Sequence, residues 1–274
     1  MCVSIRLFGG LASAVAILLA SLVSIPASAA ECGGDFQTWL AGFEREAAAQ
    51  GISQHTITSA LAGVAPDPNV ISRDRRQGVF RQSFEQFSGR MVSADRLGKG
   101  AALLKRHAAL FSRIEQQFGV PGPVLVAIWG LETDFGTNVG RYSTIRSVAT
   151  LAFDCRRSEK FRGELVEALR IVDRGDMSPA EMHGDWAGEI GQTMFLPSSY
   201  VKYAVDYDGN GRRDLIRSVP DVLASTANYL KSYGWHRGEP WGEGTPNFDV
   251  LREWNKAEVY ARTLAYFAQR LAGE

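Results

Sequence analysis

The stretch VPGPVLVAIWGLETDFG, residues 120–136, decides the fold. Pro121 and Pro123 stand where a helix begins, because the first helical turn has no use for the amide hydrogen that proline lacks. The residues after them are apolar nearly all round the helix, a pattern typical of a helix enclosed by protein. The sequence therefore predicts a central buried helix that ends near one acid, Glu132.

Helical patterns also fill most of the remaining chain, because apolar residues recur at helical spacing and stop at glycines or prolines. The other expected helices cover residues 36–50, 53–63, 80–87, 93–118, 158–173, 178 onward, 220–233 and 256–271. We expect His107 to pack in the core, and Ser178 with Glu181 to form a capping box. Only segment 206–216 gives a strong hairpin or loop signal. The expected fold class is α+β, predominantly α-helical, with a small hairpin or loop element.

Length and charge limit the functions that the chain can have. Its 274 residues are 45% hydrophobic, enough to bury a full core. The 30 basic and 30 acidic residues leave no net charge. The chain therefore has no electrostatic footprint for nucleic acid or for an anionic membrane surface, and a neutral polymer suits it as a partner.

Residues 1–29 have the layout of a secretory signal peptide. Arg6 precedes an apolar run over residues 7–25, and the small triplet Ala-Ser-Ala follows at residues 27–29. We expect cleavage after this triplet, which leaves a catalytic domain of residues 30–274 in the periplasm, with no membrane span. A retained membrane anchor is the alternative, but the run is rich in glycine, serine and alanine.

Cysteine usage fits an exported chain. Cys2 leaves with the signal peptide, so Cys32 and Cys155 remain in an oxidising compartment. We expect one disulfide between them, and two separate buried thiols are the alternative. Glu31 fits poorly with the small residues that lipid attachment requires before a cysteine, so a lipoprotein is not expected.

Common catalytic motifs are missing from the sequence. It has no Gly-x-Ser-x-Gly elbow and no phosphate-binding glycine loop, and its four histidines are too scattered for a zinc site. Glu132 remains, since apolar surroundings raise a carboxyl pKa and suit it to general acid catalysis. A hydrogen-bonding group at a helix end is the alternative. An ordinary glycosidase needs a second carboxylate, but Asp134 would point to the other side of a helix and is expected to be a local cap.

Five ordered blocks of the sequence resemble the lytic murein transglycosylases of the membrane-bound B type, which have a lysozyme-like catalytic fold. The blocks are VPGPVLVAIWGLETDFG from Val120, RSVATLAFDCRRSEKFR from Arg146, WAGEIGQTMFLPSSYVKYAVDYDGNGRRDL from Trp186, ASTANYL from Ala224 and WNKAEVYA from Trp254. The resemblance runs from about Phe36 to the C-terminus.

The resemblance implies that Glu132 is the single catalytic acid/base and that peptidoglycan glycan strands are the partner. Glu132 would protonate the glycosidic oxygen between N-acetylmuramic acid and N-acetylglucosamine. It would then take the proton of the muramyl 6-hydroxyl, which attacks the anomeric carbon in place of water and gives a 1,6-anhydromuramyl end, assisted by the substrate's acetamido group. The substrate thus supplies both nucleophiles, and no cofactor is required.

The same resemblance implies that Tyr229, Asn255 and Tyr260 line the glycan groove, with Trp254 where the family often has an aromatic residue. Each has a structural alternative. The two tyrosines lie on apolar helices and are also compatible with the core. Asn255 stands just before the last helix and is also compatible with its N-cap.

Two positions depart from the family pattern. Residues 191–198 read GQTMFLPS, so Met194 stands where a glutamine near the reacting sugar is usual, while Gln192 lies two positions earlier. Asp185 stands where a serine is usual. We count Asp185, Gln192 and Met194 among the substrate-binding residues. The departures motivate two alternatives, a catalytically impaired glycan-binding protein and a lysozyme-type hydrolase on the same scaffold.

A loop after residue 205 matches the first half of an EF-hand, whose alternating oxygens converge on calcium. Its twelfth position is Arg217 instead of glutamate. Family members with this loop can use a later aspartate. The candidate ligands are Asp206, Asp208, Asn210 and Asp221. Because three arginines offset these acids, a metal-free Asx-type turn is the alternative to a structural calcium site.

Overall fold

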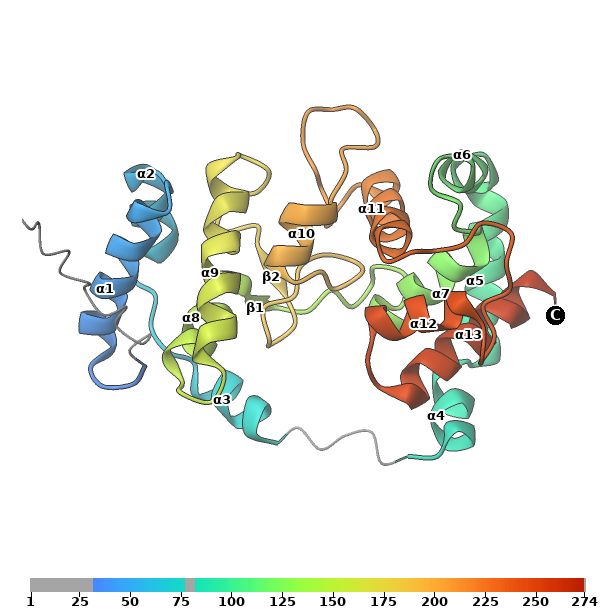
Figure 1. Ribbon diagram of the computed structural model, residues 1–274, viewed down its shortest axis with the longest axis horizontal. Coiled ribbons are helices and arrows are strands. Elements are labelled where there is room, and N and C mark those ends of the chain that lie inside the picture. Colours follow the sequence, from blue (N-terminus) through green and yellow to red (C-terminus); the bar gives the residue numbers. More distant parts are fainter. Residues whose placement is uncertain (1–31, 77–81, 274) are drawn as a thin grey trace, which may run out of the picture. The chain divides into compact units, whose positions relative to one another are not determined.

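The computed structural model describes residues 32–76 and 82–273, which contain thirteen helices and two short strands (Figure 1). The described elements are α1 (Phe36–Ala49), α2 (Gln54–Leu61), α3 (Pro68–Arg75), α4 (Phe84–Met91), α5 (Ala94–Arg106), α6 (Ala108–Phe118), α7 (Gly122–Thr133), β1 (Tyr142–Ser143), α8 (Thr144–Phe153), α9 (Ser158–Asp173), β2 (His183–Gly184), α10 (Pro197–Tyr203), α11 (Val219–Ser232), α12 (Pro246–Trp254) and α13 (Glu258–Ala272). The predicted class, α+β and predominantly helical, is confirmed. The predicted signal peptide lies outside the described residues.

Many helices begin where the sequence supplies an acceptor for the free backbone amides of a first turn. The side chains that accept such a bond at the N-cap are Asp35, Ser53, Asp67, Ser83, Ser93, Ser143, Ser218 and Thr245. Helix α7 has no side-chain cap and begins after Pro121 instead.

Helix α7 is the centre of one group of helices. Helices α5, α6, α11 and α13 all pack against it (Figure 1). Every residue from Val124 to Leu131 is buried, which confirms the central helix that the apolar pattern predicts. Gly130 is required within it, because a Cβ there would lie 2.9 Å from the ring of Phe267 on α13. The close packing fixes where the end of α7 points.

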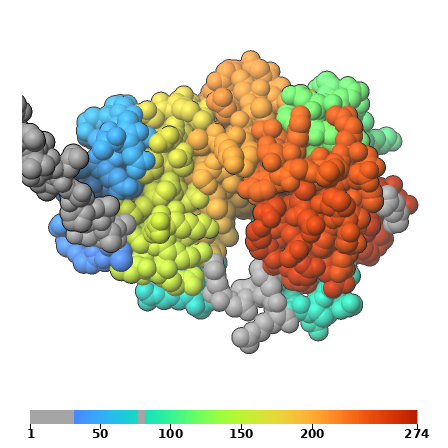
Figure 2. Space-filling model, in the orientation of Figure 1, coloured from blue at the N-terminus to red at the C-terminus, as the bar shows by residue number. Residues whose placement is uncertain are grey.

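A second group of helices packs around α9, which contacts α2, α8 and α10. In the space-filling view, the surfaces of α1 and α2 adjoin that of α9 (Figure 2). Cys32 and Cys155 form the predicted disulfide, with their Cα atoms 5.1 Å apart. Next to it, the amide of Gly33 donates to the carbonyl of Phe153 at 2.9 Å. The disulfide therefore ties the start of the described chain to the connection between α8 and α9.

The two strands form one small antiparallel pair, with Tyr142 opposite Gly184. The strands are far apart in sequence, so no local hairpin signal marks them. Segment 206–216, which gave the hairpin or loop signal, is a loop. None of the helices in the described part of the chain has the length and apolar character needed to cross a membrane.

Three local predictions need correction. The helix expected from Ser178 does not form. Glu181 accepts from the amide and the hydroxyl of Ser178, but its own amide donates to the Ser178 carbonyl, so the capping box is incomplete. Glu181 also binds Arg217 at 2.9 Å, and the chain turns into β2. The long helix expected from Ser93 is broken at His107, which separates α5 from α6. That histidine is half-buried rather than part of the core. Helices α3, α8, α10 and α12 were not expected.

Candidate active site

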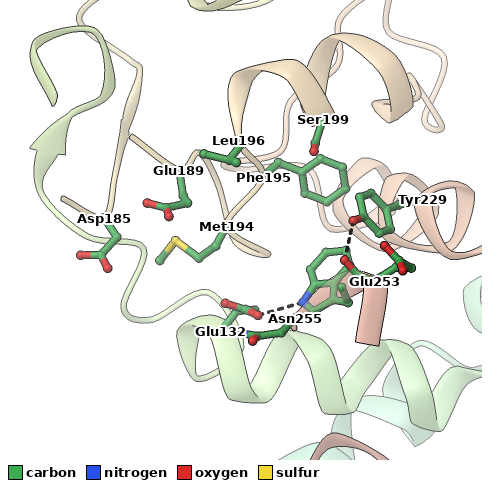
Figure 3. Close-up of a pocket in the computed structure, with 11 residues that line it drawn as sticks. Glu132, Asp185, Glu189, Met194, Phe195, Leu196, Ser199, Tyr229, Glu253 and Asn255 are labelled. Carbon is green, nitrogen blue, oxygen red and sulfur yellow. Dashed lines mark hydrogen bonds between the residues drawn. The ribbon is translucent and has the colours of Figure 1, made fainter. Parts of the chain in front are cut away.

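A cavity of about 340 Å³ opens at the C-terminal end of α7 (Figure 3). Its walls come from the end of α7, the segment between β2 and α10, the start of α10, helix α11 and the end of α12. The lining residues are Glu132, Asp185, Glu189, Met194, Phe195, Leu196, Ser199, Tyr229, Glu253, Trp254 and Asn255. Most of the residues that the sequence proposed for catalysis and substrate binding thus meet in one place.

Two neutral donors hold the carboxyl group of Glu132. The hydroxyl of Tyr260 donates to Oε1 at 2.6 Å, and the indole Nε1 of Trp254 donates to the same oxygen at 2.9 Å. None of the described residues donates to Oε2 of Glu132. One oxygen is therefore fixed by the protein, and the other is left for a ligand.

The surroundings of Glu132 raise its pKa above the usual value of a glutamate. Burial is the main cause, since it disfavours the charged form, and the negative charge of Asp185 adds to it. The hydrogen bonds from Tyr260 and Trp254 act in the opposite direction and are outweighed. Glu132 is only half-buried and lines the cavity, so a carboxyl with a raised pKa faces the place where a ligand would bind.

Gln192 connects α7 to the segment that forms the opposite wall. Its Oε1 accepts from Nε1 of Trp129 at 2.8 Å, and its Nε2 donates to the carbonyl of Ile216 at 2.7 Å. Its own carbonyl accepts from the hydroxyl of Thr133 at 2.6 Å. Gly136 is needed beside it, since a Cβ there would collide with the Gln192 side chain. The expectation that Gln192 binds substrate is therefore corrected: it is buried, and its amide is used within the protein.

Asp134 points away from the cavity, as expected. Its carboxylate lies 3.2 Å from Nε of Arg96 and 3.9 Å from Nζ of Lys99, both on α5. The backbone of Asp134 ends α7 in the left-handed conformation, with φ 51°. The residue thus ends the helix through its backbone, and its side chain forms an ion pair instead of a cap.

The predicted groove residues lie at or beside the cavity, and Asn255 is not the N-cap of α13, which is Ala257. Tyr229 lines the cavity, but it is also buried and donates to the carbonyl of Glu253 at 2.9 Å. Tyr260 is buried and reaches the cavity only through its bond to Glu132. Asn255 lines the cavity, and its Oδ1 also accepts from the amide of Ala257 just before α13.

The opposite wall carries Met194 and two acids. Met194 lines the cavity and has a positive φ of 53°, which is uncommon for a residue other than glycine. Asp185 also lies here, as predicted. Glu189 was missed by the sequence reasoning, although an acid between apolar and glycine residues in WAGEIGQT was a usable signal. Burial raises the pKa of Glu189 to about 7, with further contributions from the charges of Asp185 and Glu132.

The EF-hand-like loop brings three acids together. Asp206, Asp208 and Asp221 each offer an oxygen within 4.8 Å of the others. Asp221 is buried and accepts bonds from three backbone amides, which fix its position. Asn210, the fourth candidate, accepts from the amide of Arg212 through its Oδ1.

The arginines of the loop form their hydrogen bonds and ion pairs with residues other than the three clustered acids. Arg212 donates to the carbonyl of Asp176 at 3.0 Å, and Arg213 pairs with the carboxylate of the same residue. Arg217 pairs with Glu181 and Asp214. None of these arginines pairs with Asp206, Asp208 or Asp221, whose oxygens accept hydrogen bonds from backbone amides and from the hydroxyl of Ser218. Clustered carboxylate oxygens are also the kind of ligand that calcium prefers.

The chain is similar to known proteins along most of its length. A family model described as "Transglycosylase SLT domain" matches residues 35–245. The membrane-bound lytic murein transglycosylase B of Escherichia coli (strain K12) is 31% identical over 203 residues, which cover 72% of this chain and 55% of that protein. The chain thus spans about half the length of this curated relative.

Solved structures agree with this comparison. SltB3 from Pseudomonas aeruginosa, in complex with NAG-anhNAM-pentapeptide, is 32% identical with a TM-score of 0.83, over 88% of this chain and 80% of that one. The soluble lytic transglycosylase SltB1 from Pseudomonas aeruginosa is 25% identical with a TM-score of 0.79, over 86% and 99%. These likenesses confirm the expected lysozyme-like transglycosylase fold. The chain belongs to the transglycosylase SLT domain family.

Proposed function

We propose that this chain is a lytic transglycosylase that cleaves peptidoglycan between N-acetylmuramic acid and N-acetylglucosamine, with Glu132 as its acid/base. The observation that carries the proposal is the setting of Glu132: burial raises its pKa, two donors hold Oε1, and none of the described residues donates to Oε2 at the cavity. The relative SltB3 was solved with a muramyl fragment that bears an anhydro end, which supports the same reaction class.

In the first step, Glu132 gives its proton to the glycosidic oxygen. Oε1 already accepts two hydrogen bonds, so the proton resides on Oε2. As the bond between the anomeric carbon and this oxygen breaks, the leaving sugar keeps the proton as its hydroxyl. The carboxylate that forms on Glu132 is stabilised by the hydrogen bonds from Tyr260 and Trp254, because bonds to a charged acceptor are stronger.

In the second step, the muramyl 6-hydroxyl attacks the anomeric carbon and its proton passes to Glu132. The residue returns to its protonated form, and the product carries a 1,6-anhydro ring. The reaction consumes no water, and a single residue acts as acid and then as base. Asp134 cannot contribute, since it faces α5.

A lysozyme-type hydrolase is the second candidate, and the acids Asp185 and Glu189 favour it, because an additional carboxylate can activate water. Mass spectrometry of digested peptidoglycan separates the two. Anhydro products are lighter by one water than the reducing products of hydrolysis. Anhydro ends support the transglycosylase, and reducing ends alone would reject it.

The proposed location is the periplasm. The disulfide between Cys32 and Cys155 supports export, since such bonds persist in oxidising compartments. Fractionation of cells that express the full chain is the test. Recovery of the protein with cytoplasmic markers, with both cysteines reduced, would contradict an exported enzyme.

We also propose that Asp206, Asp208 and Asp221 bind calcium weakly and hold the loop before α11 in place. Calorimetry on chelator-treated protein should show one site, and calcium should raise the melting temperature. Asp206→Asn should abolish both effects, whereas Asp249→Asn, at an exposed position on α12, should keep them. Absence of heat and of a thermal shift at about 1 mM calcium would favour a metal-free turn.

A further inference from the structure

Glu189 is an acid on the cavity wall that the proposed mechanism does not use. Its Oε2 is buried and has no hydrogen-bond partner in the described part of the chain. Buried polar groups are nearly always hydrogen-bonded. An oxygen without a partner at the wall of a cavity therefore indicates a partner that the ligand supplies.

The surroundings of Glu189 limit what that ligand group can be. Figure 3 shows Glu189 beside Leu196 and Met194, across the cavity from Glu132, with Met194 between the two glutamates. The wall is thus apolar on the side of Met194 and Leu196, and Asp185 lies on the other side of Glu189 (Figure 3). A ligand group that fits must combine hydrogen-bonding atoms with a small apolar part.

The charges near Glu189 determine which hydrogen bonds it can make. Asp185 and Glu132 are the nearby acids, and Lys160 on α9 is the cation that acts on it with a weaker, opposite effect. Burial and these acids raise the pKa of Glu189 to about 7, so that the side chain holds a proton in neutral or mildly acidic solution. A protonated carboxyl offers one donor and one acceptor, the same pair as a side-chain amide.

We infer that Glu189 is a positioning residue that binds an N-acetyl group of the glycan beside the bond that Glu132 cleaves. The carbonyl of the acetamido group would accept from the Glu189 hydroxyl, and its N–H would donate to the other Glu189 oxygen. The acetyl methyl would lie against Met194 and Leu196. This inference rests on the proposed function, because it takes the ligand to be an N-acetylated glycan.

The test measures binding separately from catalysis. In a Glu132→Gln background, calorimetry compares a tetramer of β-1,4-linked N-acetylglucosamine with its N-deacetylated form at pH 6 and pH 8.5. Binding of the N-acetylated tetramer should weaken about tenfold from pH 6 to pH 8.5, since Glu189 loses its donor. Adding Glu189→Gln should keep the tight binding and remove the pH dependence. Adding Glu189→Ala should weaken binding about tenfold at both pH values. Glu159→Gln, at an exposed position on α9, is the matched control and should behave like the background protein.

Two results would overturn the inference. One is unchanged binding in the Glu189→Ala protein. The other is that the deacetylated tetramer binds more tightly than the N-acetylated tetramer at pH 6, and that the Glu189→Gln protein loses this preference. Glu189 would then be part of a site for a cationic amine. Digestion by the protein with Glu132 intact reports on the proposed function itself. Anhydro products together with unaltered tetramer binding in Glu189→Ala would reject the role of Glu189 alone, whereas absence of any product would reject both.

Discussion

Replacement of Glu132 by glutamine tests the proposed acid/base most directly. Glutamine keeps the size of the side chain, and its oxygen can accept the bonds from Tyr260 and Trp254, which measure 2.6 and 2.9 Å. Its NH₂ then takes the place of Oε2 but has no proton to give to a glycosidic oxygen. Loss of acid–base assistance costs about 10²- to 10⁴-fold in rate. Because one residue serves both steps, we expect the upper end, about 5.4 kcal/mol of barrier.

Fold and glycan binding should survive this change. Burial raises the pKa of Glu132 because it disfavours the charged form, and a neutral amide avoids that penalty. A neutral amide of the same shape should change the free energy of unfolding by less than about 1 kcal/mol. The assay is mass spectrometry of released muropeptides, with the melting temperature measured alongside. Asp134→Asn is the control, since it loses the ion pair with Arg96 and should keep its activity. Release of anhydro ends by Glu132→Gln at near the parent rate would refute the assignment.

Three further predictions concern single interactions. Tyr260→Phe removes a donor that favours ionised Glu132, so the alkaline limb of the pH–rate profile should move to higher pH and kcat should fall about tenfold; an unchanged profile would contradict this. Burial raises the pKa of Glu189 to about 7, so the folded protein holds a proton that the unfolded chain has released above its ordinary value of 4.5. The parent should therefore lose up to about 3 kcal/mol of stability as the pH rises from about 4.5 to above 7, and the Glu189→Gln protein should not. If the urea midpoints of the two proteins depended equally on pH, this prediction would be wrong. The disulfide spans 123 residues, so replacing Cys32 and Cys155 by serine should lower the free energy of unfolding by about 4 to 5 kcal/mol in the chain-entropy estimate. Two free thiols in a titration of the denatured, unreduced parent would contradict this.

Features encoded locally could be predicted from the sequence. The prolines and the apolar residues of α7 specify a buried helix without reference to the rest of the chain, and Glu132 stands at its end in the same stretch. Serine and aspartate caps likewise mark helix starts. The capping box at Ser178 shows the limit of such signals. Glu181 accepts from the amide of Ser178, but its own amide donates to the Ser178 carbonyl and not to the hydroxyl. Arg217, which is distant in sequence, also binds Glu181, and no helix follows.

The parts that sequence reasoning missed depend on contacts between distant segments. Strand β1 pairs with β2 across helices α8 and α9, so neither strand has a local turn signal. Gln192 reads as a substrate ligand from its motif, yet Trp129 and the carbonyl of Ile216 use its amide. Glu189 acquires its raised pKa only when the fold buries it near Asp185 and Glu132. Burial and neighbouring charge, which decide the chemistry, are properties of the folded chain.

The end of α7 shows how one helix can give two nearby acids different roles. The C-terminus of a helix carries partial negative charge, which disfavours an anion on either residue. Asp134 compensates through Arg96 and Lys99 on α5, so it serves as a structural ion pair. Glu132, on the other face, receives only the neutral donors Tyr260 and Trp254 among the described residues; these lower its pKa less than burial raises it, so its pKa stays above the usual value. A cation placed beside Glu132 would stabilise the carboxylate and remove the acid that the first step needs. Replacing Trp254 by arginine should therefore lower the pKa of Glu132. Turnover near neutral pH should fall far more in this variant than in Trp254→Phe. Equal losses of turnover in the two variants would show that the lack of charge on the donor is not what matters.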